Sequence, residues 1–348
     1  MNFRVAVVGA GRMGKLHARV VSELPGSQLV CVVDANPAAA DALAKQRGCT
    51  PLTHPADAVP LCDAAIIAVP TKFHLDAARP FLQAGKSVLI EKPLAPDVHT
   101  AREIIELARQ SGAHIQVGHT ERFNPAVLSI SQYAVTPKFI QADRISPFTF
   151  RSADVGVVLD MMIHDIDLVL TFAASRVVDV HAIGVAVIGK HEDICNARLQ
   201  FANGCVANIT ASRLAVKTER KMRIFSEQAY LSVDFALKTG VVIEKQDNLD
   251  LIQMARELDV TDLAELAASV DYTKLLNFEQ LVVDDSVEPL RRQADAFRRT
   301  VKEGAEPVVS AQAGLAAIET AYQILDAIAH HHWDGDATGR AGSDVLKK

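Results

Sequence analysis

The sequence is poor in cysteine, in aromatic residues and in excess basic charge. Its five cysteines are scattered over 348 residues and form no Cys-x-x-Cys pair, which argues against a disulfide framework and against a zinc site. We expect them to be reduced, mostly buried thiols of a cytoplasmic protein. The three histidines at 330–332 are expected to form a solvated helix end rather than a metal site. A net charge of −6, with no basic stripe, argues against nucleic acid as a partner.

Long hydrophobic runs are missing as well. No apolar run reaches the roughly 18 residues that a membrane-spanning helix needs, so we expect no membrane contact. The first strand is expected to begin by about residue 3, which leaves no room for a signal peptide. With 49% apolar and 22% charged residues the composition is that of a globular protein, and the length suggests two domains.

A glycine-rich loop follows the first predicted strand. Four apolar residues, Val5–Val8, lead into Gly9-x-Gly11-x-x-Gly14 and then into a helix-compatible stretch. In a dinucleotide-binding loop these glycines allow the tight turn, the approach of a pyrophosphate and the packing of helix on strand, respectively. Asp34 ends a second predicted strand 20 residues later, where a carboxylate would bind the adenosine ribose hydroxyls. The pattern predicts NAD as the cofactor; the alternative is an ordinary strand–turn–helix.

The first third of the chain alternates predicted strands (29–33, 64–69, 87–90, 114–117) with predicted helices (37–47, 74–84, 97–111). This alternation predicts an α/β fold with a doubly wound (Rossmann) parallel sheet, whose ligands lie at the carboxyl ends of the strands. Residues that follow later strands are therefore expected at the same cleft as the glycine loop. The predicted cofactor-binding residues are Gly9, Gly11, Arg12, Met13, Gly14, Asp34, Pro70, Thr71, His74, Glu91 and Lys92.

The pattern changes after residue 125. Asn203-Gly204 lies between two apolar segments and predicts a hairpin with a type I′ turn. With further strands predicted at 139–150, 220–225 and 230–235, this favours an α+β domain with a large, mostly antiparallel open sheet. Helices are predicted at 126–133, 159–172, 249–276, 289–303 and 311–330. We divide the chain into an NAD-binding Rossmann domain (1–122), a substrate-binding and oligomerisation domain (123–333) and a loose tail (334–348).

Two groups of residues are candidates for chemistry. Lys92 directly follows a buried strand, where an ammonium would stabilise negative charge on a substrate oxygen. Asp160, His164 and Asp167 are spaced i, i+4, i+7 and would share one helix face. A carboxylate beside an imidazole suits a base that takes a proton from an alcohol. The alternatives are a surface lysine paired with Glu91 and a solvated polar stripe on a helix.

Three motifs, in this order, resemble the Gfo/Idh/MocA oxidoreductases: Gly9-x-Gly11-x-x-Gly14, Glu91-Lys92-Pro93 and Asp160-x-x-x-His164-x-x-Asp167. The resemblance implies a Rossmann domain followed by an α/β domain whose open sheet forms homodimers or homotetramers. It also implies a catalytic group of Lys92, Asp160 and His164. His164 would accept the hydroxyl proton, Asp160 would orient its imidazole, and Lys92 would stabilise the alkoxide; the residues alone leave open which of Lys92 and His164 takes the proton.

A narrower resemblance lies in residues 118–125 and 162–167, which are similar to the branch of the family that oxidises the 3-hydroxyl of UDP-N-acetylglucosamine. Arg144 and Arg151 precede the predicted catalytic helix, and arginines suit a nucleotide pyrophosphate, although both also fit surface positions of strands. The expected substrate-binding residues are Lys92, His119, Arg122, Arg144, Arg151 and His164, and no residue is expected to bind metal.

The expected function is therefore NAD-dependent oxidation of a sugar's secondary alcohol to a ketone, with a nucleotide sugar as the small-molecule substrate. Alternatives are a dehydrogenase of a free sugar or a polyol such as inositol, an NAD-dependent glycosidase, and a non-catalytic NAD(H) sensor. The presence of Lys92, Asp160 and His164 together argues against the sensor, which has no use for an acid–base pair.

Overall fold

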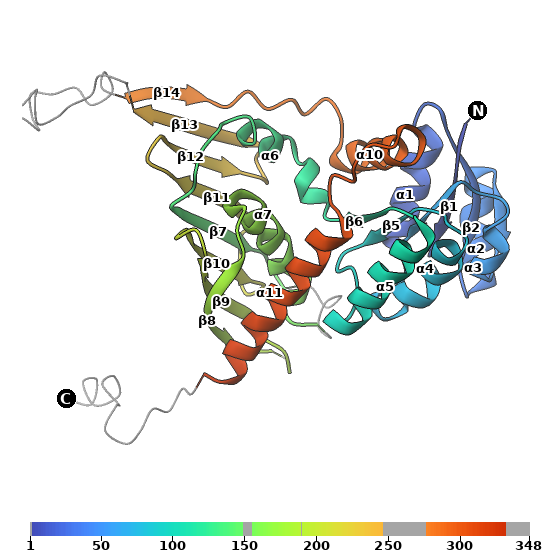
Figure 1. Cartoon of the computed structure of the whole chain (residues 1–348), viewed down its shortest axis with the longest axis horizontal. Helices are drawn as coiled ribbons and strands as arrows, with labels where there is room; N and C mark the ends of the chain where they lie inside the picture. Colours follow the sequence, from blue (N-terminus) through green and yellow to red (C-terminus); the bar gives the residue numbers. More distant parts are fainter. Residues whose placement is uncertain (1, 149–154, 189, 246–275, 332–348) are drawn as a thin grey trace, which may run out of the picture.

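The structure, a computed structural model, describes residues 2–148, 155–188, 190–245 and 276–331. Three sequence-based expectations lie outside these ranges: the substrate contact of Arg151, the helix at 249–276 except its last residue, and the loose tail at 334–348. The described chain forms two sheets joined through residues 119–138 (Figure 1).

The first sheet consists of β1 (Phe3–Val8), β2 (Ser27–Val33), β3 (Thr50–Leu52), β4 (Ala64–Ile67), β5 (Val88–Glu91) and β6 (Ile115–Gly118). All its pairings are parallel and its strand order is β3-β2-β1-β4-β5-β6, which confirms the doubly wound sheet. The order reverses between β1 and β4, and ligands of such sheets bind at that point. The connecting helices are α1 (Arg12–Glu23), α2 (Pro37–Arg47), α3 (Pro55–Ala58), α4 (His74–Gln83) and α5 (Val98–Ser111), with a 3-10 turn η1 (Thr71–Phe73) before α4.

Capping residues explain why the predicted helix bounds fit well in this part of the chain. The side chain of Asn36 accepts hydrogen bonds from the first turn of α2, and Gly48 ends that helix in the left-handed conformation. Asp97 caps α5 by accepting a bond of 2.7 Å from the Thr100 N–H, and Gly112 ends it in the same way as Gly48.

The second sheet has eight strands in the order β14-β13-β12-β11-β7-β10-β9-β8. They are β7 (Phe139–Ile145), β8 (Val177–Val185), β9 (Ile194–Phe201), β10 (Val206–Ser212), β11 (Glu219–Phe225), β12 (Ala229–Asp234), β13 (Thr239–Lys245) and β14 (Leu276–Gln280). Only the β7–β10 pairing is parallel, as expected for a mostly antiparallel sheet.

One face of this sheet is packed and the other is open. In β9 every second residue is buried, from Cys195 to Phe201, while the residues between them are exposed. Helices α7 (Ile163–Ala173) and α11 (Ala311–Ala329) pack on the buried side, as Figure 1 shows. The alternation of period 2 in the sequence therefore marks a sheet that is covered on one face only.

The β9–β10 hairpin is present, but its turn differs from the predicted type I′. That type needs positive φ at both central residues, and here Gly204 has φ +85° whereas Asn203 is not among the residues with positive φ. The Asn203 side chain instead donates a hydrogen bond of 2.9 Å to the backbone oxygen of Ala173 and accepts one from the Cys205 N–H. The Asn203 side chain thus joins the hairpin turn to the end of α7.

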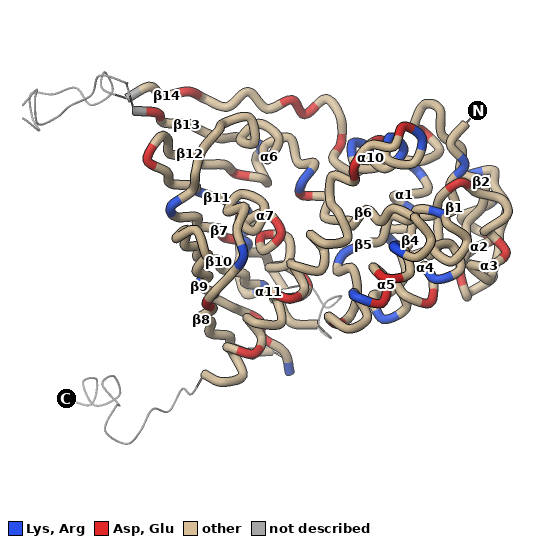
Figure 2. Tube along the Cα trace, viewed as in Figure 1, with Lys and Arg blue, Asp and Glu red and all other residues tan. Residues whose placement is uncertain are grey.

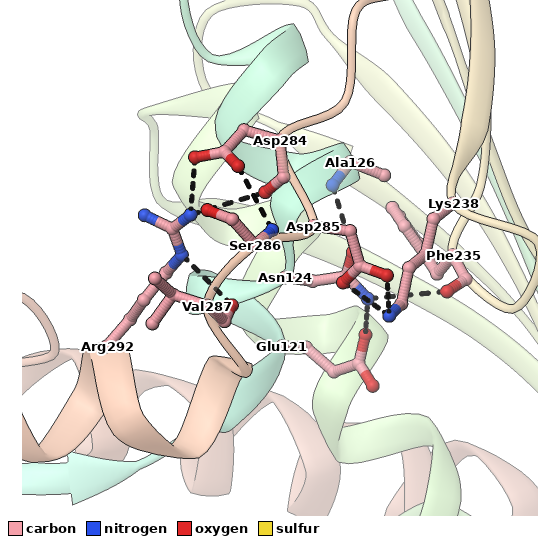
Figure 3. Close-up of polar contacts among 10 residues, drawn as sticks. All are labelled: Glu121, Asn124, Ala126, Phe235, Lys238, Asp284, Asp285, Ser286, Val287 and Arg292. Carbon is pink, nitrogen blue, oxygen red and sulfur yellow. Dashed lines mark hydrogen bonds and ion pairs between the residues drawn. The ribbon is translucent and has the colours of Figure 1, made fainter.

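The chain after β14 returns to the first sheet. Helix α10 (Pro289–Glu303) packs against α1, and its Phe297 ring lies edge-on to that of Phe3, with centroids 6.0 Å apart. Figure 3 shows two ion pairs that fix the connecting segment: Lys238 with Asp285 at 2.6 Å and Arg292 with Asp284 at 2.9 Å. The expected domain 123–333 thus carries two helices that also pack on the first unit: α10, which lies against α1, and α11 (Ala311–Ala329), which contacts α5 and β6.

The described helices include none that is both long and apolar enough to cross a lipid bilayer. Acidic and basic residues are interspersed in both units (Figure 2).

Candidate active site

A cleft of about 860 Å³ is lined by residues of both units. The first unit contributes the glycine loop and the carboxyl ends of β4, β5 and β6; the second contributes the end of β7, the segment before α7 and two arginines. The lining residues are Arg12, Met13, Ala68, Val69, Glu91, Lys92, Gly118, Thr120, Arg144, Ser146, Pro147, Asp160, Met161, His164, Arg213, Arg220 and Leu290.

The glycine loop has the shape that a dinucleotide requires. Gly9 has φ +107°, and a Cβ there would lie 2.5 Å from the backbone oxygen of Ala68. A Cβ on Gly14 would lie 1.7 Å from the Gly9 oxygen, so the helix could not pack this closely with any other residue. At Gly11, by contrast, a Cβ would meet nothing within 4 Å. This open space before the first N–H groups of α1 fits a pyrophosphate.

Asp34 is held beside this loop at the end of β2. One carboxylate oxygen accepts a hydrogen bond of 2.7 Å from the Ala10 N–H, and the other accepts one of 2.9 Å from the Asn36 N–H. The carboxylate is thus fixed in orientation while remaining partly accessible. This arrangement fits a group that binds the two hydroxyls of an adenosine ribose.

Of the predicted cofactor-binding residues after β4, two lie in the turn that follows the strand and one is buried. Pro70 and Thr71 begin the turn η1 at the carboxyl end of the strand. His74 is buried, with its ring nitrogens 3.0 Å from the Val69 oxygen and 3.2 Å from the Leu94 oxygen. Burial lowers the pKa of this imidazole. His74 therefore holds Val69, which lines the cleft, and does not line the cleft itself.

Lys92 and Glu91 have different partners and do not form the ion pair with each other that the sequence left open as an alternative. The Nζ of Lys92 donates a hydrogen bond of 2.6 Å to the backbone oxygen of Asp160 and lies 3.6 Å from its carboxylate. Glu91 instead lies 2.6 Å from the Nε2 atom of His17, a buried residue of α1. Burial lowers the pKa of Lys92, opposed by the charges of Asp160 and Glu91.

The polar stripe predicted for Asp160, His164 and Asp167 is only partly present. Asp160 lies in a π-helical turn, Val158–Met162, that precedes α7, and such a turn shifts the helical phase. Asp160 and His164 both line the cleft, whereas Asp167 is buried behind it and accepts two hydrogen bonds, of 2.7 and 2.8 Å, from Arg122. Among the described contacts, Asp160 binds Lys92 and forms no hydrogen bond with His164.

His164 has the protonation state that a base needs. Burial, followed by the positive charges of Lys92 and Arg144, holds its pKa well below the usual range. The His119 ring stands at 90° to the His164 ring, with centroids 6.3 Å apart. His119 is buried, and neither of its ring nitrogens has a hydrogen-bond partner in the part of the chain that the structure describes. The imidazole of His164 is therefore neutral near pH 7 and can accept a proton.

The arginines expected at the substrate are placed differently from one another. Arg144 lines the cleft and is bound by Asp165 at 2.6 and 2.9 Å. Arg122 faces Asp167 instead and lines a separate hollow next to α11. Sequence reasoning missed two further cleft arginines, Arg213 and Arg220, because they come from strand ends that only long-range pairing brings to the site.

The described residues contain no group of three or more His, Cys, Asp or Glu side chains arranged to hold a metal ion.

Comparison with known proteins identifies the family. Residues 3–119 match the family model described as an oxidoreductase family with an NAD-binding Rossmann fold, and residues 132–232 match the GFO/IDH/MocA C-terminal domain. The chain belongs to the GFO/IDH/MocA oxidoreductase family. As a member of it, the protein is an NAD-binding enzyme that acts on CH–OH groups.

Individual relatives of this GFO/IDH/MocA member include a UDP-N-acetylglucosamine 3-dehydrogenase of Acidithiobacillus ferrooxidans, 36% identical over 240 residues, which cover 69% of this chain and 76% of the relative. An inositol 2-dehydrogenase of Rhizobium meliloti is 27% identical over 346 residues, covering 94% and 98% of the two chains. The solved structure of the Acidithiobacillus enzyme matches with a TM-score of 0.82 at 29% identity, over 94% of this chain and 98% of that one.

Proposed function

We propose that the protein oxidises the 3-hydroxyl of UDP-N-acetylglucosamine to a ketone, with NAD as the cofactor. The observation that supports this most is the composition of the cleft: Lys92 and His164 face the same space as the glycine loop, and the opposite wall carries arginines. The similarity to a UDP-N-acetylglucosamine 3-dehydrogenase supports the same substrate.

In the proposed reaction the residues of this chain handle the proton and the developing charge. The neutral imidazole of His164 accepts the hydroxyl proton, because burial and neighbouring cations keep it unprotonated. Lys92, fixed by its bonds to Asp160, donates a hydrogen bond to the same oxygen and stabilises its alkoxide character. NAD supplies the hydride acceptor when bound at the glycine loop. Asp160 thereby acts on Lys92 rather than on the imidazole.

Inositol oxidation is the second candidate, because an inositol 2-dehydrogenase is similar over nearly the whole chain. A neutral polyol, however, gives no binding role to Arg220, an exposed arginine that lines the cleft. The two candidates therefore differ in whether the substrate carries phosphate.

The test is a comparison of kcat/KM for UDP-N-acetylglucosamine, other UDP-sugars, free N-acetylglucosamine and myo-inositol, with NADH formation followed by absorbance. The proposal predicts that UDP-N-acetylglucosamine gives the highest value. Oxidation of myo-inositol or free sugars in preference to it would contradict the proposal. Release of an aglycone from a glycoside without net NADH would indicate the glycosidase instead, and binding of NAD without any turnover would indicate the sensor.

We also propose that the open face of the second sheet is the contact between subunits of a homodimer or homotetramer. This face carries a cluster of aromatic rings in which Phe225 lies 5.7 Å from Phe139 and 4.8 Å from Tyr230, between centroids. Phe225 is 38% exposed in the isolated chain, and clustered exposed aromatics are typical of interfaces. Sedimentation of wild type and Phe225→Glu tests this: the variant should be smaller, and a monomeric wild type would contradict the proposal.

A further inference from the structure

The three arginines that the second unit presents to the cleft are not held equally. Arg144 and Arg213 are buried, with exposed fractions of 4% and 3%, and each is bound at 2.6 Å by a buried carboxylate, Asp165 and Asp193 respectively. Pulling either guanidinium away would leave an unpaired charge in the interior, which is strongly unfavourable. Both are therefore fixed parts of the wall.

Arg220 is different. It lies on β11 directly opposite Arg144 on β7, so both side chains project from the same face of the sheet. Its side chain is 44% exposed, and its ion pair with Glu121 is long, 3.9 Å to Oε1. The same oxygen lies 3.7 Å from Arg144. Two like charges placed opposite each other repel, and here they share one carboxylate oxygen.

Glu121 has a partner of its own besides the two arginines. Its second oxygen accepts a hydrogen bond of 3.3 Å from the amide of Asn124, which also donates one of 3.4 Å to the backbone oxygen of Phe235 (Figure 3). Asn124 in turn caps helix α6 (Pro125–Ile130) through the Ala126 N–H. If Arg220 turns toward a ligand, Glu121 therefore retains its bond to Asn124 and its contact with Arg144.

We propose that Arg220 binds the diphosphate of the nucleotide-sugar substrate and selects it over neutral sugars. The inference rests on the proposed function, whose substrate carries that group. A guanidinium offers two parallel N–H donors to phosphate oxygens. Among the arginines that the described part of the second unit presents to the cleft, Arg220 combines high exposure with a weak partner, so its reorientation costs least.

The first experiment compares wild type, Arg220→Gln, Arg220→Lys and Arg109→Gln. Arg109 is an exposed arginine in the last turn of α5, paired with Glu106 and outside the cleft, so it is a control for loss of one arginine. With UDP-N-acetylglucosamine, Arg220→Gln should raise KM by roughly tenfold to a hundredfold with kcat almost unchanged, since a bond to a charged group is lost from ground and transition state alike. The KM of Arg220→Lys should lie between those of wild type and Arg220→Gln, and the KM of Arg109→Gln should match that of wild type. An Arg220→Gln variant that also matches wild type would overturn the inference.

A second measurement separates this inference from the choice of reaction. Titration calorimetry of UDP into the NAD-loaded protein needs no turnover. UDP binding that is weakened in Arg220→Gln and kept in Arg109→Gln supports the role of Arg220 even if the 3-hydroxyl is not oxidised, in which case only the proposed reaction fails. Turnover of UDP-N-acetylglucosamine with equal UDP affinity in all variants overturns the role of Arg220 alone. If wild type neither binds UDP nor turns over UDP-N-acetylglucosamine, the role of Arg220 and the proposed reaction are both overturned.

Discussion

The Nζ atom of Lys92 lies 3.6 Å from the carboxylate of Asp160 and donates a hydrogen bond of 2.6 Å to its backbone oxygen. Lys92 follows β5 of the first sheet, and Asp160 belongs to the π-helical turn before α7 of the second unit. The contact thus joins the two units at the cleft and aims the ammonium at the space between the glycine loop and His164.

Replacing Lys92 with Ala should remove most of the activity while the protein still folds and binds NAD. A positioned charge contact to a developing alkoxide contributes about 3 kcal/mol, so kcat should fall roughly a hundredfold or more. Steady-state kinetics and NAD titration measure the two effects. Lys45→Ala, an exposed lysine on α2, is the control. A Lys92→Ala enzyme within about threefold of the control would remove Lys92 from the mechanism.

The pH dependence of the oxidation should reflect the lowered pKa of His164. Its pKa is held well below the usual range by burial and by the charges of Lys92 and Arg144, so the base stays unprotonated as the pH falls through about 6.5. The kcat/KM of the wild type should therefore be level there and decline only at lower pH. His164→Asn should lower kcat roughly a hundredfold or more and abolish this acidic limb. A limb centred near 6.5 in the wild type would contradict the assignment.

Asp34 should make the enzyme prefer NAD over NADP. Its carboxylate is fixed by the Ala10 and Asn36 N–H groups, so a 2′-phosphate would meet a like charge and lose the bonds that a hydroxyl makes. The preference in kcat/KM should be about tenfold or greater, and Asp34→Ser should reduce it. Asp41→Ser, an exposed change on α2, serves as the control. Equal use of both cofactors by wild type would show that Asp34 does not discriminate between them.

The pair of Arg144 and Asp165 should contribute to stability more than to binding. Arg144→Met leaves a carboxylate that is 1% exposed without its partner, which should lower the free energy of unfolding by about 3–5 kcal/mol. Arg144→Met combined with Asp165→Leu removes both charges and should recover most of that loss. Urea unfolding measures both variants. If the single variant is as stable as wild type, Arg144 is not a fixed part of the cleft wall.

Local signals in the sequence were sufficient to predict most helices and strands of the first unit. The Asn36 and Asp97 caps and the glycines after α2 and α5 fix the helix ends through contacts within a few residues. Elements without such signals were missed, as in β3, whose three residues (Thr50–Leu52) include a proline and lie at the sheet edge. The tertiary structure creates that strand by pairing it with β2.

In the candidate site, Lys92, Asp160 and His164 could be predicted because each belongs to a short motif. Their mutual contacts could not, because an i, i+4 spacing assumes a regular helix and the chain forms a π-helical turn at Asp160. Arg220 was missed for another reason: it resembles any charged residue on a strand until β11 pairs with β7 and places it opposite Arg144.

UDP-N-acetylglucosamine that carries deuterium at C3 shows whether hydride leaves C3 of the sugar for NAD while His164 takes the hydroxyl proton. The labelled substrate should react more slowly than the unlabelled one, give a ketone product and leave its deuterium in the reduced nicotinamide. Oxidation that leaves the deuterium on the sugar, or no oxidation of this substrate under conditions where an inositol is oxidised, would rule out this hydride transfer.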